Sequence, residues 1–72
     1  MKSGLLWYDA SANDITAKIM QAATRYQQKF GVKPDTCFVN PHDVPQVEKV
    51  QGIQIKSKAT IMPNHLWLGI TE

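Results

Sequence analysis

The chain has 72 residues and a mass of 8.1 kDa, which is enough for one small domain that buries about 60% of its unfolded surface. Its composition, 43% hydrophobic and 19% charged with four Gly and four Pro, excludes a collagen-like repeat and argues against a disordered tail. One cysteine excludes an internal disulfide framework, and no apolar run approaches the roughly 20 residues of a membrane span. We therefore expect a single cytoplasmic α/β domain over residues 1–72 that does not bind membranes.

The net charge of +2 comes from eight Lys and Arg against six Asp and Glu. Arg25 is the one arginine, so it alone has the planar guanidinium that binds bases and phosphates in a bidentate manner. A sequence pI near 8.9 permits weak attraction to nucleic acid but is also common in proteins that bind none. The charge therefore does not decide between partners.

The first predicted element is a strand over residues 4–9. Leu5 and Trp7 would lie on one face of this strand, and Leu6 and Tyr8 on the other. A strand that is apolar on both faces is typical of the inside of a sheet.

Residues 14–30 have helical periodicity, and Gly31 is the expected C′ residue. The predicted buried stripe consists of Ile15, Ile19, Ala22, Ala23, Tyr26 and Phe30. Before the helix, Ser11 with Asp14 resembles a capping box, and Asn13 is an alternative N-cap.

Residues 36–40 read as a second strand that is apolar on both faces. With a long helix between them, the first two strands are expected to form a right-handed parallel βαβ unit. Asp43 can then cap a short second helix over residues 44–51, in which Pro45 fits the first turn.

The last twenty residues are expected to form an antiparallel β-hairpin. Residues 53–61 alternate between apolar and polar side chains, and residues 65–71 do the same after the turn Pro63-Asn64. The predicted order is therefore β-α-β-α-β-β. It makes an α/β (α+β) domain with a parallel βαβ core, a C-terminal hairpin and a four-stranded mixed sheet with the helices mainly on one face.

Helices on one face would leave the other face of the sheet apolar and uncovered. That face would contain either Leu5 and Trp7 or Leu6 and Tyr8, together with residues of the second strand and Trp67. A homodimer through a sheet face or edge would cover it, and a small core benefits from such extra burial. The expected interface residues are Trp7, Tyr8, Phe38 and Trp67. In the alternative arrangement, helices on both sides of the sheet would cover both faces.

Polar residues that follow the two parallel strands are the candidates for catalysis. Asp9, Asn40 and His42 could converge at the carboxyl ends of these strands, where ligands bind in open α/β sheets. The same residues are also ordinary turn and cap residues, which is the more economical interpretation.

Cys37, His42 and His65 are weak candidates for metal ligands. Their spacing matches no standard zinc finger, and Cys37 in the middle of a strand is better explained as a small buried side chain. The loop before the long helix lacks the glycines of a phosphate-binding loop, and no catalytic motif is present. We therefore expect no cofactor and no metal, and a non-enzymatic role is favoured over an enzymatic one.

Three functions remain, in order of preference. The first is a small binding or assembly module that forms a homodimer through an apolar sheet face or edge. The second is a nucleic-acid-binding module that uses Arg25, Lys56 and Lys58 beside exposed aromatic rings, although lysines on a strand also protect sheet edges from aggregation. The third is a small hydrolase or metal-assisted enzyme at Asp9, Asn40 and His42.

Overall fold

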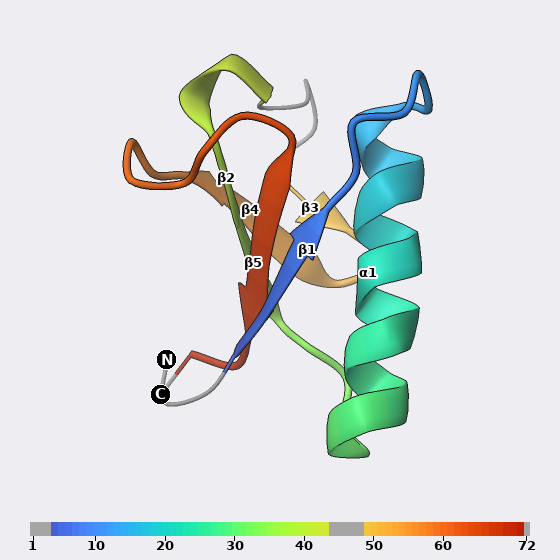
Figure 1. The fold of residues 1–72 in the computed structure, drawn as a ribbon. Coiled ribbons are helices and arrows are strands. Elements are labelled where there is room, and N and C mark those ends of the chain that lie inside the picture. Colours follow the sequence, from blue (N-terminus) through green and yellow to red (C-terminus); the bar gives the residue numbers. More distant parts are fainter. Residues whose placement is uncertain (1–3, 44–48, 72) are drawn as a thin grey trace.

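The computed structural model describes residues 4–43 and 49–71 of the chain, and in this part it is a compact α+β domain. One helix packs against a five-stranded mixed sheet (Figure 1). The elements are β1 (Gly4–Tyr8), α1 (Ile15–Phe30), β2 (Thr36–Val39), a short 3-10 helix (Pro41–Asp43), β3 (Lys49–Val50), β4 (Ile53–Ser57) and β5 (His65–Gly69).

The strand order is β1-β5-β2-β4-β3. β5 is antiparallel to both of its neighbours, β1 and β2, while β4 is parallel to β2 and β3 is antiparallel to β4. β1 and β2 therefore run in the same direction, as predicted, but β5 lies between them. The predicted βαβ core is thus a split unit, and the directly parallel pair is β2 with β4.

The predicted C-terminal hairpin is wrong, because β4 and β5 lie on opposite sides of β2 and do not pair. Seven residues separate Ser57 from His65, and this segment carries the chain across the end of β2. There the Lys58 N–H donates to the Val39 carbonyl at 2.9 Å. The alternation of apolar and polar residues specified which side chains are buried, but it is compatible with more than one neighbouring strand.

The predicted second helix is also wrong at its C-terminal end, since Lys49 and Val50 form strand β3. Its first residues, 44–48, lie outside the described part of the chain. Gln51 and Gly52, with φ of 53° and 82°, join β3 to β4. Two consecutive residues with positive φ are typical of a type I′ hairpin turn, in which Asn-Gly is the usual signal and Gln-Gly a weak one. The fold therefore has a fifth strand where a helix was expected.

Helix α1 agrees closely with its prediction. Gly31 ends the helix with φ of 76°, and its N–H donates to the Gln27 carbonyl at 2.8 Å. The N-cap is Asp14 rather than Ser11 or Asn13. The Asp14 carboxylate accepts a hydrogen bond from the Thr16 hydroxyl at 2.7 Å instead of capping a backbone N–H.

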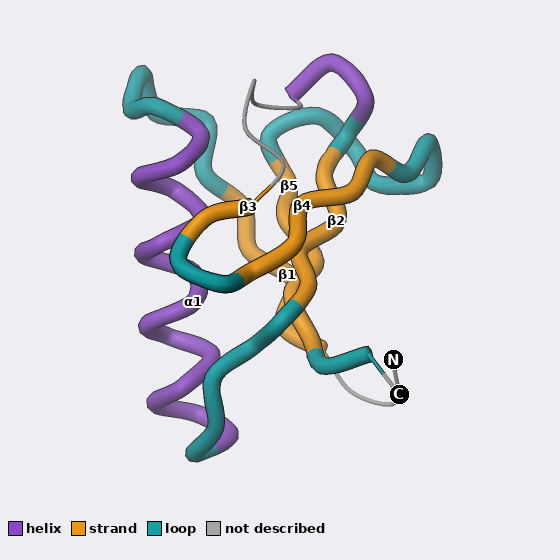
Figure 2. Tube along the Cα trace, turned by 180° about the vertical axis from the view of Figure 1, so that it is seen from behind, coloured by secondary structure: helices purple, strands orange, loops and turns teal. Residues whose placement is uncertain are grey.

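The core lies between α1 and one face of the sheet, and both backbone views show α1 on that side (Figures 1 and 2). The predicted stripe of α1 is confirmed, because its four central residues are buried and its two end residues are partly buried. The buried apolar side chains that the sheet contributes to this core are Cys37, Val39, Val50, Ile53, Leu66 and Leu68, while Thr36 and Gly69 are buried on the other face of the sheet. In the part of the chain that the structure describes, no second helix covers the opposite face.

We expect Ile19→Ala, at the centre of the buried stripe, to lower the free energy of unfolding by about 2–5 kcal/mol, as large-to-small core substitutions do. The matched control is Met20→Ala, one position along α1, where the side chain is 45% exposed and the loss should stay below about 1 kcal/mol. Urea unfolding followed by circular dichroism measures both. Equal losses for the two variants would contradict the assigned packing face.

Candidate functional site

The sheet residues that point away from α1 form what we call the open face. The strand registers identify them, because residues directly opposite one another across neighbouring strands share a face. The members are Gly4, Leu6 and Tyr8 of β1, His65, Trp67 and Gly69 of β5, Thr36 and Phe38 of β2, Gln54 and Lys56 of β4, and Lys49 of β3.

One row of the open face crosses four strands. Leu6 is opposite Trp67, Trp67 is opposite Phe38, and Phe38 is opposite Lys56. Directly opposite side chains have Cβ atoms about 4.5–5.5 Å apart, so the four side chains lie next to one another. The row therefore changes from apolar, through aromatic, to basic across the sheet.

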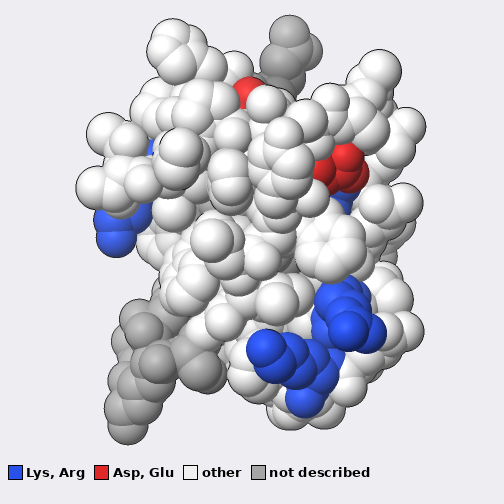
Figure 3. Space-filling model, viewed as in Figure 1, with Lys and Arg blue, Asp and Glu red and all other residues white. Residues whose placement is uncertain are grey.

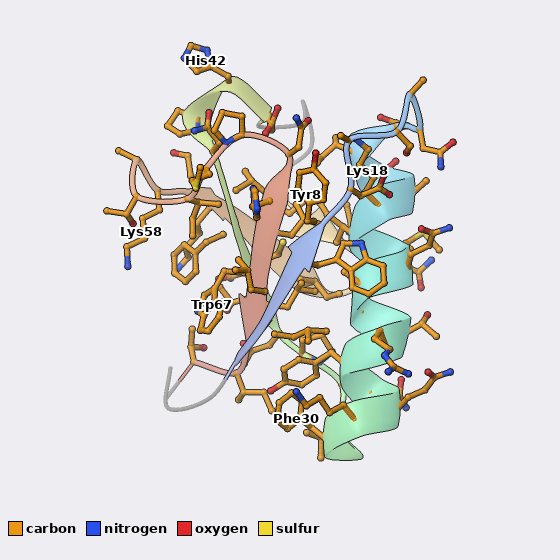
Figure 4. All side chains as sticks on the ribbon, in the orientation of Figure 1. Tyr8, Lys18, Phe30, His42, Lys58 and Trp67 are labelled. Carbon is orange, nitrogen blue, oxygen red and sulfur yellow. The ribbon has the colours of Figure 1, made fainter. Side chains whose placement is uncertain are left out.

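The Trp67 indole lies close to the backbone of β1 because Gly4 has no side chain. A Cβ atom at Gly4 would come within 2.6 Å of the indole Cζ2 and within 2.8 Å of the Leu68 carbonyl oxygen. Only glycine is compatible with this close approach without a shift of the indole or the backbone. In Figure 4 Trp67 lies on the side of the sheet away from α1, where its side chain is partly exposed.

A second aromatic group lies on the same face. Tyr8 is 62% exposed, and its ring contacts that of His65 with a centroid distance of 4.8 Å and an interplanar angle of 48°. The His65 Nδ1 lies 2.9 Å from the Pro63 carbonyl oxygen, a contact that orients the imidazole. Leu6, on the same face of the edge strand β1 as Tyr8, is 57% exposed.

Lysines flank the aromatic rings on the β4 side. Lys49 and Lys56 belong to the open face, and Lys58 follows β4 with its Nζ 5.4 Å from the centroid of the Phe38 ring. This distance is within the range of a cation–π interaction. No carboxylate is among the open-face residues that the structure describes, and the Asp35 carboxylate lies beside Lys49 at the margin of this face.

Asp35 lies at the margin of the open face, where it lines a shallow depression with Lys49 and Gln54. Its carboxylate accepts hydrogen bonds from the Thr71 N–H at 2.9 Å and the Thr36 hydroxyl at 2.8 Å. These bonds, that of Thr71 above all, hold the pKa of Asp35 below its ordinary value. The side chain therefore fastens the end of β5 to β2 as an anion.

Arg25 does not share a surface with Lys56 and Lys58. It is an exposed residue of α1, the element that packs on the opposite face of the sheet. Figure 3 accordingly shows one basic group over the C-terminal half of α1 and another at the far left of the molecule, with uncharged surface between them. The three predicted nucleic-acid contacts thus divide into two separate sites.

Trp7 also lies apart from the other predicted interface residues. It is opposite Leu66, on the face covered by α1, where it packs against the core. Tyr8, Phe38 and Trp67 are together on the open face. The apolar residues of β1 that stay uncovered are therefore Leu6 and Tyr8, one of the two sets considered from the sequence.

Asp9, a predicted catalytic residue at the carboxyl ends of the parallel strands, instead stabilises the turn before α1 by a hydrogen bond. Its Oδ1 accepts the Ser11 N–H at 2.9 Å, and the side-chain and backbone bonds from Ser11 lower the pKa of Asp9. An ionised carboxylate of this kind is a poor general acid at neutral pH. Lys18 of α1 is a buried residue, and its ammonium donates to the Asp9 carbonyl at 2.9 Å.

Asn40 and His42 do not form a reactive pair. The Asn40 amide donates to the Ile61 carbonyl at 2.8 Å, and its Oδ1 accepts the His42 backbone N–H, also at 2.8 Å. The exposed His42 imidazole points out from the top of the molecule in Figure 4. Asp9 makes no hydrogen bond to Asn40 or His42 within the described residues, so the rim supports turns rather than an assembled catalytic group.

The candidate metal ligands are on different sides of the sheet. Cys37 is fully buried towards α1, whereas His65 is on the open face and His42 is in the loop after β2. Burial raises the pKa of the Cys37 thiol to about 12, so it is neither a nucleophile nor a ready ligand at neutral pH. Across residues 4–43 and 49–71, no three His, Cys, Asp or Glu side chains are grouped to hold a metal ion.

The chain matches no protein-family model, and it has no significant match among curated proteins or solved structures. Within the described residues, α1 is neither long enough nor apolar enough to cross a bilayer. The site must therefore be interpreted from its own geometry. Lys49 is an open-face residue that sequence reasoning missed, because it was assigned to the predicted second helix, whereas it lies in strand β3.

If Asn40 has a structural role, Asn40→Ala should lower the free energy of unfolding by about 1–3 kcal/mol, because it leaves a buried carbonyl and N–H without partners. Asn13→Ala, at an exposed position before α1, is the control and should change stability by less than about 0.5 kcal/mol. Thermal and urea unfolding give both values. A fully stable Asn40→Ala protein would reopen the catalytic interpretation of this residue.

Proposed function

We propose that this chain is a small non-enzymatic binding module that holds a nucleic acid on the open face of its sheet. The observation that supports the proposal is the composition of that face, where aromatic rings and lysines lie side by side without a carboxylate among its described residues. The buried single thiol of Cys37 is compatible with a reducing cytoplasm, which is part of the proposal.

Charge favours an anionic partner over a second copy of the chain. Lys49, Lys56 and Lys58 contribute three positive charges to one side of the molecule, and phosphates are the complementary groups of a polyanion. Two copies placed face to face would bring six lysines together, and like charges across an interface oppose association.

Area supports the same conclusion. Leu6 and Tyr8 are more than half exposed, but Phe38 and Trp67 are only partly so, and the patch is on the order of a few hundred Å², as on many monomers. A stable protein interface buries about 800 Å² on each partner. A face-to-face dimer would therefore have to extend over the lysines, where the charge opposes it.

We expect the double variant Lys56→Gln/Lys58→Gln to bind a fluorescein-labelled oligonucleotide at least about tenfold more weakly at low salt. The slope of log affinity against log salt concentration should decrease in magnitude by about two. The reason is that binding with two fewer phosphate contacts releases fewer counterions. Fluorescence anisotropy at several salt concentrations measures both quantities.

The matched control is Arg25→Gln/Lys29→Gln, which removes the same charge from α1 on the opposite side of the molecule. It should leave affinity within about twofold, since the remaining effect is long-range and screened. If the two double variants weaken binding equally, or if neither does, the open face is not the nucleic-acid site.

A homodimer through the open face is the second candidate, and the exposure of Leu6, an apolar side chain with no polar group, is the observation that favours it. Size exclusion with light scattering distinguishes the two functions. We expect a monomer of 8.1 kDa. A mass of twice that value, returning to the monomer mass in Leu6→Ser, would support the dimer instead.

A further inference from the structure

The inference here rests on the proposed function and specifies its ligand. We infer that the nucleic acid is single-stranded and that its unpaired bases stack on the rings of Trp67, Phe38 and Tyr8. The rings belong to three neighbouring strands, β5, β2 and β1, so one ligand strand that crosses the sheet can meet all of them.

The bases of a duplex cannot stack on aromatic rings that lie on an open sheet. Paired bases are stacked on one another and present only their edges and the phosphates, whereas an unpaired base has a free face that can stack on a side chain. A Cβ atom at Gly4 would come within 2.6 Å of the Trp67 indole, so the glycine lets this ring lie close to β1, and the side chain as a whole stays partly exposed. A duplex would use the lysines but would not use this platform.

The lysines indicate where the phosphates would lie. Lys56 is directly opposite Phe38, and the Lys58 ammonium is 5.4 Å from the centroid of the same ring. Because the Lys58 ammonium lies over the Phe38 ring, a base that stacks on this face would displace the ammonium towards the phosphate of the same nucleotide. The sugar–phosphate chain would follow β4, and the bases would extend over β2, β5 and β1.

The three rings can accept about three bases, one on each ring, similar to the two or three bases that aromatic side chains stack on the sheets of small RNA-binding domains. Tyr8 and Trp67 are not in the same register row, because Tyr8 is opposite His65 and Trp67 is opposite Leu6. The strand should therefore cross the sheet obliquely. None of these contacts reads base edges, so we expect weak dependence on sequence.

The test compares a mixed-sequence 12-nucleotide single strand, as DNA and as RNA, with the same sequence as duplex and with heparin, all by anisotropy or competition. We expect the single strand to bind about tenfold more tightly than the duplex or heparin. Tyr8→Ala should weaken single-strand binding about fivefold or more while duplex affinity stays within about twofold, in the range expected for the loss of one stacking contact.

Leu6→Ala is the control for lost apolar surface, since Leu6 lies on the same strand and face and is similarly exposed. It should weaken single-strand binding by less than about twofold. Trp67→Leu should behave like Tyr8→Ala, and thermal unfolding of each variant shows whether it is folded.

Two kinds of failure are distinguishable. If single strand, duplex and heparin bind equally and Tyr8→Ala has no effect, while Lys56→Gln/Lys58→Gln weakens binding to all three, base stacking is refuted and the nucleic-acid proposal stands. If no nucleic acid binds, or if the lysine variant binds as well as the wild type, the proposed function itself is wrong.

Discussion

The position of β5 between β1 and β2 is the constraint on which the rest of the structure depends. β5 pairs with both neighbours, so its backbone is hydrogen-bonded on both sides. Its successive side chains point alternately to the two faces of the sheet. Leu66 and Leu68 extend into the core beneath α1, while Trp67 extends to the open face. A one-residue slip of β5 would exchange these sets, exposing two leucines and burying an indole where α1 packs.

A single 16-residue helix can cover only one face of the sheet, so the other face is in contact with solvent. The covered face is aliphatic and closely packed. The open face instead uses side chains that tolerate water on one side, namely Tyr8, Trp67 and Phe38, together with lysines. Aromatic residues and lysines stabilise an exposed sheet through packing and cation–π contacts while keeping it polar enough to stay dispersed. The same composition suits a ligand that has both flat apolar rings and phosphates.

The polar residues at the carboxyl rim show how a plausible catalytic group can be a set of structural contacts. A side-chain oxygen of each of three rim residues accepts a hydrogen bond from a backbone N–H. These residues are Asp9, Asn40 and Asp43. The bond from the Asn64 N–H to Asp43, with that from the Asn40 amide to the Ile61 carbonyl, holds the loop from β4 to β5 across the end of β2 and so supports the topology that places β5 centrally. The polar side chains of the rim thus stabilise the fold through hydrogen bonds, and the surface that is free to bind a partner lies on the sheet.

Much of this protein was determined locally by its sequence. The periodicity of residues 14–30 and the αL geometry of Gly31 specified α1, and the alternation of apolar and polar residues in β4 and β5 specified which of their side chains face the core. The tertiary structure alone decided which strands are neighbours, since apolar alternation is satisfied by any partner of suitable register. It therefore decided that Trp7 is covered while Tyr8 is not, and that Lys49 joins the open face. Arg25 was separated from Lys56 and Lys58 for the same reason: the face that α1 covers depends on contacts between distant residues, which no local pattern records.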